Sequence, residues 1–512
     1  MGMQMGYHKS SAIQDALTWF EQRDMFSMQM QSLNRPRNLE QNADDELALL
    51  LYDAAPQNTT TSGGEVGQAQ PAANESPWHS FFDKSDIIGF GRRSTLERAF
   101  DLGPRHFSSV PTPVRYSSTE DQFSILLDRY DREFCTYPIT TDVDINPFRY
   151  RKETSRGSKH LLHAIIALAC HHRDGYPVQN SPSIEFYQHK NQAVALYRAA
   201  MENPQIQAQS LSALDTLLAL WCIDSIESAL NPWRTHLSHA YALLELSGGI
   251  DVWSLSFRSQ TQVTMLLWWD AVVALVSRRP CVMPYTYFEA VLQWESSQFW
   301  TFFELIGCPR ELLVPLMQFA HLAGQFNRWS RGMNVTKAVI AQVEGNLRNY
   351  QPPGEDEDVD SRDEEKVQEA RDTYHCCEAI RHSLLIYALR VFSDDDRYMD
   401  SSYMTARLKY LSRVSLDHVC SISPSSGTLK QLLFVILVAG AETNDDDHKD
   451  FIRGYCRRWF ETFGYPMFTS VIEILEEVWT GRDVVGEDIW WGDVVDSRHH
   501  GGIDGDLVFC FG

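Results

Sequence analysis

The stretch KDFIRGYCRRWFETF (449–463) distributes its apolar and charged residues with the period of an α-helix. Two adjacent apolar rows recur at every fourth position, namely Phe451, Tyr455, Trp459 and Phe463, and beside them Ile452, Cys456 and Phe460. Arginine and glutamate occupy the opposite side. Gly464 predicts the end of this helix, because glycine adopts the left-handed conformation of a helix C-terminus without steric cost. Such a helix has to bury its apolar face against other helices.

The same period dominates the chain from about residue 116 onward. Helices are predicted at 121–134, 160–172, 184–202, 210–227, 233–249, 261–276, 367–392, 402–420, 428–442 and 469–481. In the last of these, the spacing of Ser470 and Glu473 predicts a capping box. No strand-like alternation or Asn-Gly hairpin turn interrupts these segments. The predicted fold is therefore all-α, a helical superhelix or bundle of stacked helix pairs preceded by a disordered N-terminal region.

Composition divides the chain into three parts. Residues 1–115 are predicted to be mostly disordered, because they are rich in small polar residues, glycine and proline. Within them, ADDELALLLYDAA (43–55) combines carboxylates with leucines; it fits either an activation-type segment for a partner groove or a short helix docking on its own domain. The domain itself is expected at 116–480 with an acidic loop at 352–366, followed by an acidic, aromatic C-terminal tail at 481–512.

The charge balance argues against several functions. The net charge is −23 and the isoelectric point is about 5.1, so the surface repels phosphate backbones and direct DNA binding is not expected. The most basic stretch, 149–159, fits a solvated loop or else a nuclear-import or phosphate-contacting patch. Ten scattered cysteines without a CxxC motif indicate reduced, buried thiols. The longest apolar run, 432–441, is about half of a membrane span, so no membrane association is expected.

Histidines gather in HLLHAIIALACHHRD (160–174). On a helix, His160, His163 and His171 share one face, but His160 and His171 lie about 16 Å apart along the axis. One metal ion cannot be shared across that span. The face is interpreted as polar or lightly packed.

Two further groups of helix residues are given the same interpretation. They are His236 with His239, and His375 with Glu378 and His382, the last three spread over about 10 Å of axis. Asp395, Asp396 and Asp400 have the DDxxxD spacing that holds Mg²⁺ in helical terpene synthases, but the second metal motif of those enzymes is missing. No phosphate-binding, dinucleotide-binding or hydrolase motif occurs. No catalytic, cofactor-binding or metal-binding residue is therefore assigned, and the chain is not expected to be an enzyme.

Four stretches, in this order, resemble the fungal-specific transcription factor domain, the regulatory region of fungal zinc-cluster transcription factors. They are NPFRYRKETSRGSKHLLHAIIALACHHRD (146–174), WRTHLSHAYALLELSGG (233–249), WWDAVVALVSRRP (268–280) and the segment 432–479. Members commonly carry a six-cysteine zinc cluster near the N-terminus, whereas residues 1–134 contain no cysteine here. Zinc is thus expected for the family but its ligand cysteines are absent. Either upstream coding sequence is missing, or the regulator works without its own DNA-binding domain.

The resemblance implies a transcriptional regulator of RNA polymerase II genes, with a metabolic or secondary-metabolite pathway as the family-level expectation. It implies the nucleus as location, with the cytoplasm left open. Implied partners are the transcriptional machinery or coactivators, a DNA-binding partner or a small-molecule effector, and a homodimer is left open. Two alternatives remain: a ligand-binding or scaffold protein on the same fold without transcriptional output, and, more remotely, a Mg²⁺-dependent all-helical enzyme.

Overall fold

A computed structural model describes residues 118–150, 158–173, 183–201, 211–326, 334–353, 363–392, 401–485, 489–499 and 507–512. Contacts divide the chain into residues 1–101 and 102–512, and all described residues belong to the second unit. The disorder predicted for 1–115, the segment 43–55 and the DDxxxD group at 395–400 lie outside the described residues.

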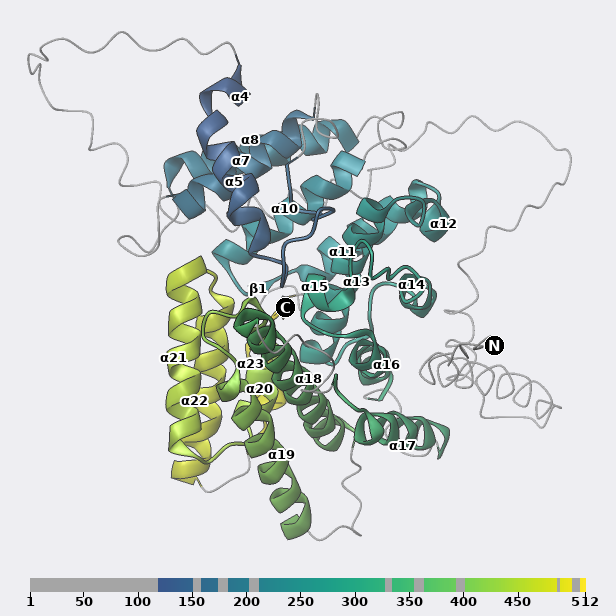
Figure 1. The fold of residues 1–512 in the computed structure, drawn as a ribbon, viewed down its shortest axis with the longest axis vertical. Coiled ribbons are helices and arrows are strands. Elements are labelled where there is room, and N and C mark those ends of the chain that lie inside the picture. The colour runs from purple at the N-terminus through teal and green to yellow at the C-terminus, as the bar shows by residue number, and fades with distance from the viewer. Residues whose placement is uncertain are drawn as a thin grey trace, which may run out of the picture. The chain divides into compact units, whose positions relative to one another are not determined.

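The described chain is almost wholly helical, which confirms the predicted fold class (Figure 1). Its first part comprises α4 (Thr119–Gln122), α5 (Ser124–Arg132), η1 (Phe134–Thr136), α7 (Lys159–Arg173), α8 (Ile184–Met201), α10 (Leu211–Glu227), α11 (Trp233–Leu246), α12 (Gly249–Trp253) and α13 (Phe257–Ser277). Next come α14 (Tyr285–Val291), α15 (Phe302–Ile306), α16 (Arg310–Phe326), α17 (Asn334–Asn349) and α18 (Glu364–Val391). The last part comprises α19 (Ser401–Ser421), η2 (Gly427–Leu432), α20 (Leu433–Gly440), α21 (Asp446–Phe463), α22 (Met467–Val485) and α23 (Trp491–His499).

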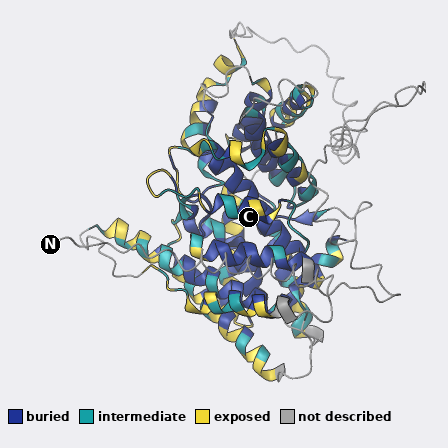
Figure 2. Ribbon diagram, turned by 90° about the vertical axis from the view of Figure 1, so that its right-hand side faces the viewer, coloured by how far each residue is buried: buried dark blue, intermediate teal, exposed yellow. Residues whose placement is uncertain are grey.

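Neighbouring helices in the chain pack as pairs. Helix α7 lies against α8, α18 against α19, and α21 against α22 (Figure 1). Helix α13 is central, because every residue from Ser259 to Ser277 is buried. Helices from earlier and later in the chain contact it, including α10, α16 and α23. Figure 2 shows that buried residues lie where the described helices face one another, whereas exposed residues lie on the outer faces of these helices. Burial on all sides explains why 265–276 is apolar at every position except Asp270.

The segment 481–512, expected as a tail outside the domain, contributes to the core. Strand β2 (Val508–Phe509) pairs antiparallel with β1 (Leu230–Asn231), and Leu230 lies opposite Phe509. Trp491 of α23 and Phe511 are fully buried. The sequence concealed this role because acidic and glycine residues separate the few apolar side chains that do the packing.

Helix ends follow the sequence in some places and depart from it in others. Gly464 ends α21 in the left-handed conformation with φ 73°, as predicted. The capping box predicted at Ser470 is wrong, because α22 begins at Met467 and the Ser470 amide already donates to the Pro466 carbonyl at 2.9 Å. Proline directly before the first turn is favourable, since its fixed φ suits a helix start.

The predicted acidic loop also ends earlier than expected. Helix α18 begins at Glu364, and the Asp363 side chain accepts a hydrogen bond from the Lys366 amide. Carboxylates in a first helical turn interact favourably with the free amides and dipole at that end. The sequence predicts a loop up to residue 366, whereas Asp363, Glu364 and Glu365 form the start of α18.

Two glycines of one hairpin provide a matched stability test. Gly464→Ala places a β-carbon at positive φ and should destabilise the domain by about 1 kcal/mol. Gly454→Ala lies in the exposed middle of α21, where an added β-carbon meets nothing within 4 Å, and should stabilise by about 0.5–1 kcal/mol. Urea unfolding of both variants checks the opposite signs. Equal effects would contradict the described end of α21.

Candidate functional site

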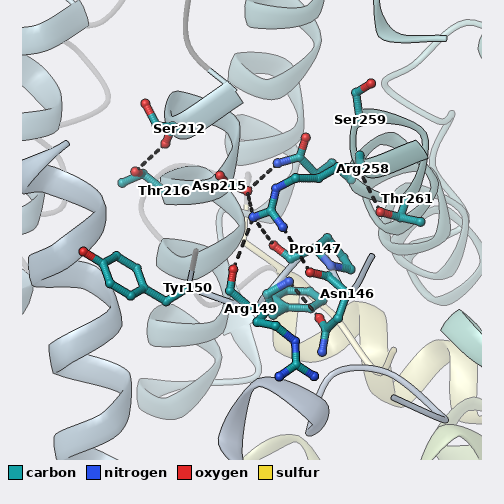
Figure 3. A network of polar contacts seen from close by, with 12 residues as sticks. Asn146, Pro147, Arg149, Tyr150, Ser212, Asp215, Thr216, Arg258, Ser259 and Thr261 are labelled. Carbon is teal, nitrogen blue, oxygen red and sulfur yellow. Dashed lines mark hydrogen bonds and ion pairs between the residues drawn. The ribbon is translucent and has the colours of Figure 1, made fainter. Parts of the chain in front are cut away.

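The connector between η1 and α7 is fixed by one buried arginine. Arg258, in the first turn of α13, directs its guanidinium at three backbone carbonyls of the connector, those of Asn146, Pro147 and Arg149, at 3.2–3.4 Å (Figure 3). Its Nη2 also donates to Asp215 of α10 at 2.8 Å. The planar fork of a guanidinium suits several acceptors at once, so one side chain joins the connector, α10 and α13.

The ion pair between Arg258 and Asp215 is largely shielded from solvent. The Asp215 side chain is 2% exposed and that of Arg258 is 10% exposed. Gln262, one turn further along α13, donates a second hydrogen bond to the Asp215 carboxylate. A buried charge needs both a counter-charge and hydrogen bonds, and here each ion has both.

The connector is further shaped by its own side chains. Asn146 is fully buried; its amide nitrogen donates to the Cys135 carbonyl at 3.0 Å and its amide oxygen accepts from the Phe148 amide at 2.9 Å. Arg149 forms an ion pair with Asp142. The first arginine of the basic stretch 149–159 is thus engaged inside the domain rather than available to a phosphate backbone.

The other end of the connector forms one wall of a cavity of about 60 Å³. The lining residues come from the connector, α10, α13, η2 and α20, the α21–α22 corner, and the last two residues: Tyr137, Pro138, Trp221, Cys222, Ser225, Trp269, Lys430, Gln431, Leu433, Phe463, Tyr465, Met467, Phe468, Phe511 and Gly512. Segments far apart in the sequence therefore meet here. The sequence could not predict this meeting, because no single segment carries its pattern.

Aromatic rings make up much of this lining. Trp221 of α10 and Trp269 of α13 stack in parallel, with ring centroids 4.6 Å apart and planes 2° apart. The Tyr137 and Phe463 rings, which also belong to the lining, lie 4.6 Å apart. Stacked indoles lose little conformational entropy, so the walls are rigid and apolar.

Lys430 of η2 has the only charged side chain among the residues of this lining, which also includes Gly512, the last residue of the sequence. Its ammonium donates to the Thr136 carbonyl at 2.9 Å, and no carboxylate among the described residues pairs with it. Burial lowers the pKa of Lys430 from its ordinary 10.5 to about 8, with no other contributor. Lys190 is the contrast: Asp224 and Glu227 lie 2.9 and 2.8 Å from its ammonium, and their charges keep its pKa above the ordinary value despite burial.

The remaining titratable side chains of the lining are neutral near pH 7. Burial raises the pKa of Cys222 to about 12 and that of Tyr465 well above its ordinary value. Burial, and then the nearby Glu133 carboxylate, raises the pKa of Tyr137. The side chains of the lining are thus mostly apolar and aromatic, and Lys430 has the only charged one.

The histidines of α7 go to separate partners. His160 contacts the Thr216 hydroxyl at 2.7 Å, His163 the His189 ring at 2.8 Å, and His171 the Phe463 carbonyl at 3.3 Å. Each of the three histidines thus has a different partner. The expectation of a lightly packed face is wrong for His160 and His171, which are buried, because α8, α10 and α5 cover α7 on several sides.

A second group forms between α18 and α19. Ligand atoms of Glu378, His382 and His418 lie within 4.8 Å of one another, and the His375 and His418 Nδ1 atoms are 2.9 Å apart. Sequence reasoning identified the three α18 residues but missed His418, which comes from another helix. Arg381 donates to both Glu378 carboxylate oxygens, at 2.9 and 2.5 Å, so the guanidinium already neutralises the group's only carboxylate. The structure thus offers a polar contact between two helices rather than an open ligand set.

Comparison with known families identifies the domain. The sequence profile described as fungal specific transcription factor domain matches residues 126–503, well over half of the 512-residue chain. The chain belongs to this family. Neither the curated proteins nor the solved structures compared with it gave a match. Among the described helices of this fungal transcription factor domain, none combines the length and apolarity that crossing a bilayer requires.

Removing the arginine of the connector should destabilise the domain strongly. Arg258→Ala leaves the Asp215 carboxylate buried without its counter-charge, which costs about 3–5 kcal/mol. Arg348→Ala is the control, because it removes an i,i+4 pair with Glu344 whose arginine is 47% exposed, and should cost about 0.5 kcal/mol or less. Chemical denaturation measures both. A loss below about 1 kcal/mol for Arg258→Ala would contradict the role of the pair.

Lys430 should give the domain a characteristic pH dependence. Between pH 8 and 10.5 the unfolded chain keeps the Lys430 proton and the folded chain has lost it, so the unfolding free energy rises with pH. The slope is on the order of 1 kcal/mol per pH unit. The difference in unfolding free energy between the wild-type protein and Lys430→Met isolates the contribution of Lys430, because the cysteines and tyrosines that titrate in the same pH range contribute equally to both proteins. A difference between the two proteins that stays flat from pH 8 to 10.5 would contradict the uncompensated burial of this ammonium.

Proposed function

We propose that this chain regulates transcription by RNA polymerase II in the nucleus, in control of a metabolic or secondary-metabolite pathway, with its helical domain as the part that receives a signal. The family match over 126–503 is the observation that carries the proposal, since members act in fungal transcription. The chain then works as a regulator and not as an enzyme.

Within this proposal the parts of the chain have different tasks. The acidic, leucine-rich segment 43–55 contacts coactivators or the transcriptional machinery, because carboxylates keep its leucines solvated and available to an apolar groove. The helical domain responds to a small-molecule effector or a partner protein. DNA is reached through a DNA-binding partner, a division that the net charge of −23 favours.

A tethered reporter assay tests the proposal. Fused to a foreign DNA-binding domain, the whole chain and residues 1–115 should each change reporter transcription. Replacing Leu49, Leu50 and Leu51 by serine should remove most of the effect of the 1–115 fusion, because the apolar contact is lost. Replacing Thr59, Thr60 and Thr61 by alanine is the control and should leave it intact. No change from either fusion would refute a transcriptional output.

A second candidate function is a ligand-binding protein without transcriptional output. The cavity around Lys430 favours it, because a small-molecule site is useful without transcription as well. Retention in the cytosol and unchanged transcripts after deletion of the gene would support this candidate. Nuclear accumulation with altered transcripts would exclude it.

A further inference from the structure

Exposed apolar side chains gather at one corner of the domain. Half of the ten large apolar side chains that the described residues expose come from the end of α11, from α12, from the start of α13 and from the turn at 296–299: Leu246, Val252, Leu255, Phe257 and Phe299. Leu255, between α12 and α13, is 81% exposed, and the Phe257 and Phe299 rings stack with their centroids 4.0 Å apart. Figure 1 shows α12 at the outer edge of the described helices. We call these five side chains the corner patch.

The corner that presents this patch is held in place from inside. Gly248 leads the chain from α11 into α12 with φ 109°, and a β-carbon there would lie 2.6 Å from Val252. Trp253 of α12 is buried, and its indole Nε1 donates to the Leu244 carbonyl of α11 at 3.2 Å. The Ser259 hydroxyl of α13 donates to the Trp253 carbonyl at 2.7 Å. The three helices are thus joined behind the patch, so little backbone ordering is needed when a partner binds.

The corner patch is also poor in charge. Asp251 is the only charged residue in 246–257 and 296–299, although 22% of the whole chain is charged. The polar residues exposed beside the apolar ones are two serines and a glutamine, namely Ser256, Ser297 and Gln298. Exposed apolar side chains on other helices have a charged neighbour one turn away: Ile125 has Arg129, Tyr403 has Arg407, and Tyr410 has Arg413. The corner patch therefore differs from these single apolar residues in both size and charge.

We propose that the corner patch is the contact of a twofold homodimer, in which the patch of one chain packs against the same patch of a second copy. In such a contact each side chain meets the equivalent surface of the other chain. The proposal goes beyond the proposed function, because self-association does not depend on transcriptional output.

Charge and shape favour a second copy over other partners. A net charge of −23 makes two copies repel each other, so close approach requires a face with few carboxylates. The corner patch is such a face, because its contact with itself brings together only the two copies of Asp251. A nucleic acid or an anionic membrane requires basic side chains, and 246–257 and 296–299 contain none. A small molecule requires a concave site, whereas Leu255 protrudes.

The exposed area suits a dimer that forms at moderate concentration. The five residues are between 37% and 81% exposed, which at roughly 200 Å² for each fully exposed residue gives on the order of 500 Å². Monomeric proteins rarely expose one apolar patch larger than roughly 300–600 Å². With its polar surroundings included, the patch has the dimensions of a small interface, since a standard one buries about 800 Å² on each partner. A dissociation constant in the micromolar range is expected.

Sedimentation equilibrium of the full chain tests the proposal. The wild-type protein should show a monomer–dimer equilibrium between about 1 and about 100 μM, with a limiting mass twice the 58.7 kDa of one chain. Raising sodium chloride from about 0.05 to about 0.5 M should tighten the dimer, because salt screens the repulsion between acidic chains and leaves the apolar contact in place. A chain that stays monomeric up to about 100 μM, or one that associates beyond the dimer, would overturn the proposal.

Two substitutions at matched exposure locate the contact. Leu255→Asp should raise the dimer dissociation constant at least about tenfold, because it places two like charges in the apolar contact. Ile184→Asp is the control, since Ile184 of α8 is 77% exposed and lies outside the corner patch. It adds the same charge and should change the constant less than about twofold.

Phe299→Gln provides an independent variant, because it removes one ring of the stacked pair without adding charge. It should weaken the dimer about fivefold, and it decides the question if Leu255→Asp does not fold. Tyr187→Gln is its control, with 41% exposure against 42% for Phe299. A dimer that survives both patch variants, or that both controls weaken equally, uses another face and contradicts the proposal. A monomeric chain that still changes transcription of the tethered reporter would refute the dimer and leave the proposed function standing.

Discussion

The domain depends on one buried guanidinium. Arg258 lies at the start of the central helix α13. Its guanidinium donates hydrogen bonds to three connector carbonyls and to the Asp215 carboxylate of α10. Carbonyls that would otherwise be buried without donors are satisfied by a group that offers five N–H bonds in a fixed plane. Two helices and an irregular segment are thereby held at one point. These hydrogen bonds fix the position of the connector relative to α10 and α13.

The cavity is a consequence of that arrangement. With its far end fixed at Arg258, the connector carries Tyr137 and Pro138 to the place where α10, η2 and the α21–α22 corner converge. The stacked indoles of Trp221 and Trp269 keep the opposite wall rigid. Side chains from several separate elements thus surround a space of about 60 Å³ where they meet.

Charge is distributed unevenly between surface and interior. The net charge of the whole chain is −23. Arginines in the interior of the described region nevertheless pair with specific carboxylates. Arg390 donates to both oxygens of Glu442 at 2.7 Å, and Arg278 pairs with Asp496. Lys430 departs from this rule in a protein with an excess of carboxylates.

The sequence by itself determined the helical class, the positions of most helices and the end of α21 at Gly464, because apolar periodicity and glycine conformation are local properties. It also separated His160 from His171, since helical rise alone fixes their distance. Only the tertiary structure decided that His418 joins Glu378 and His382, that 481–512 contributes to the core, and that Lys430 lines one cavity with Trp221 and Trp269. These contacts join segments tens to hundreds of residues apart, and no pattern within one segment encodes its partner.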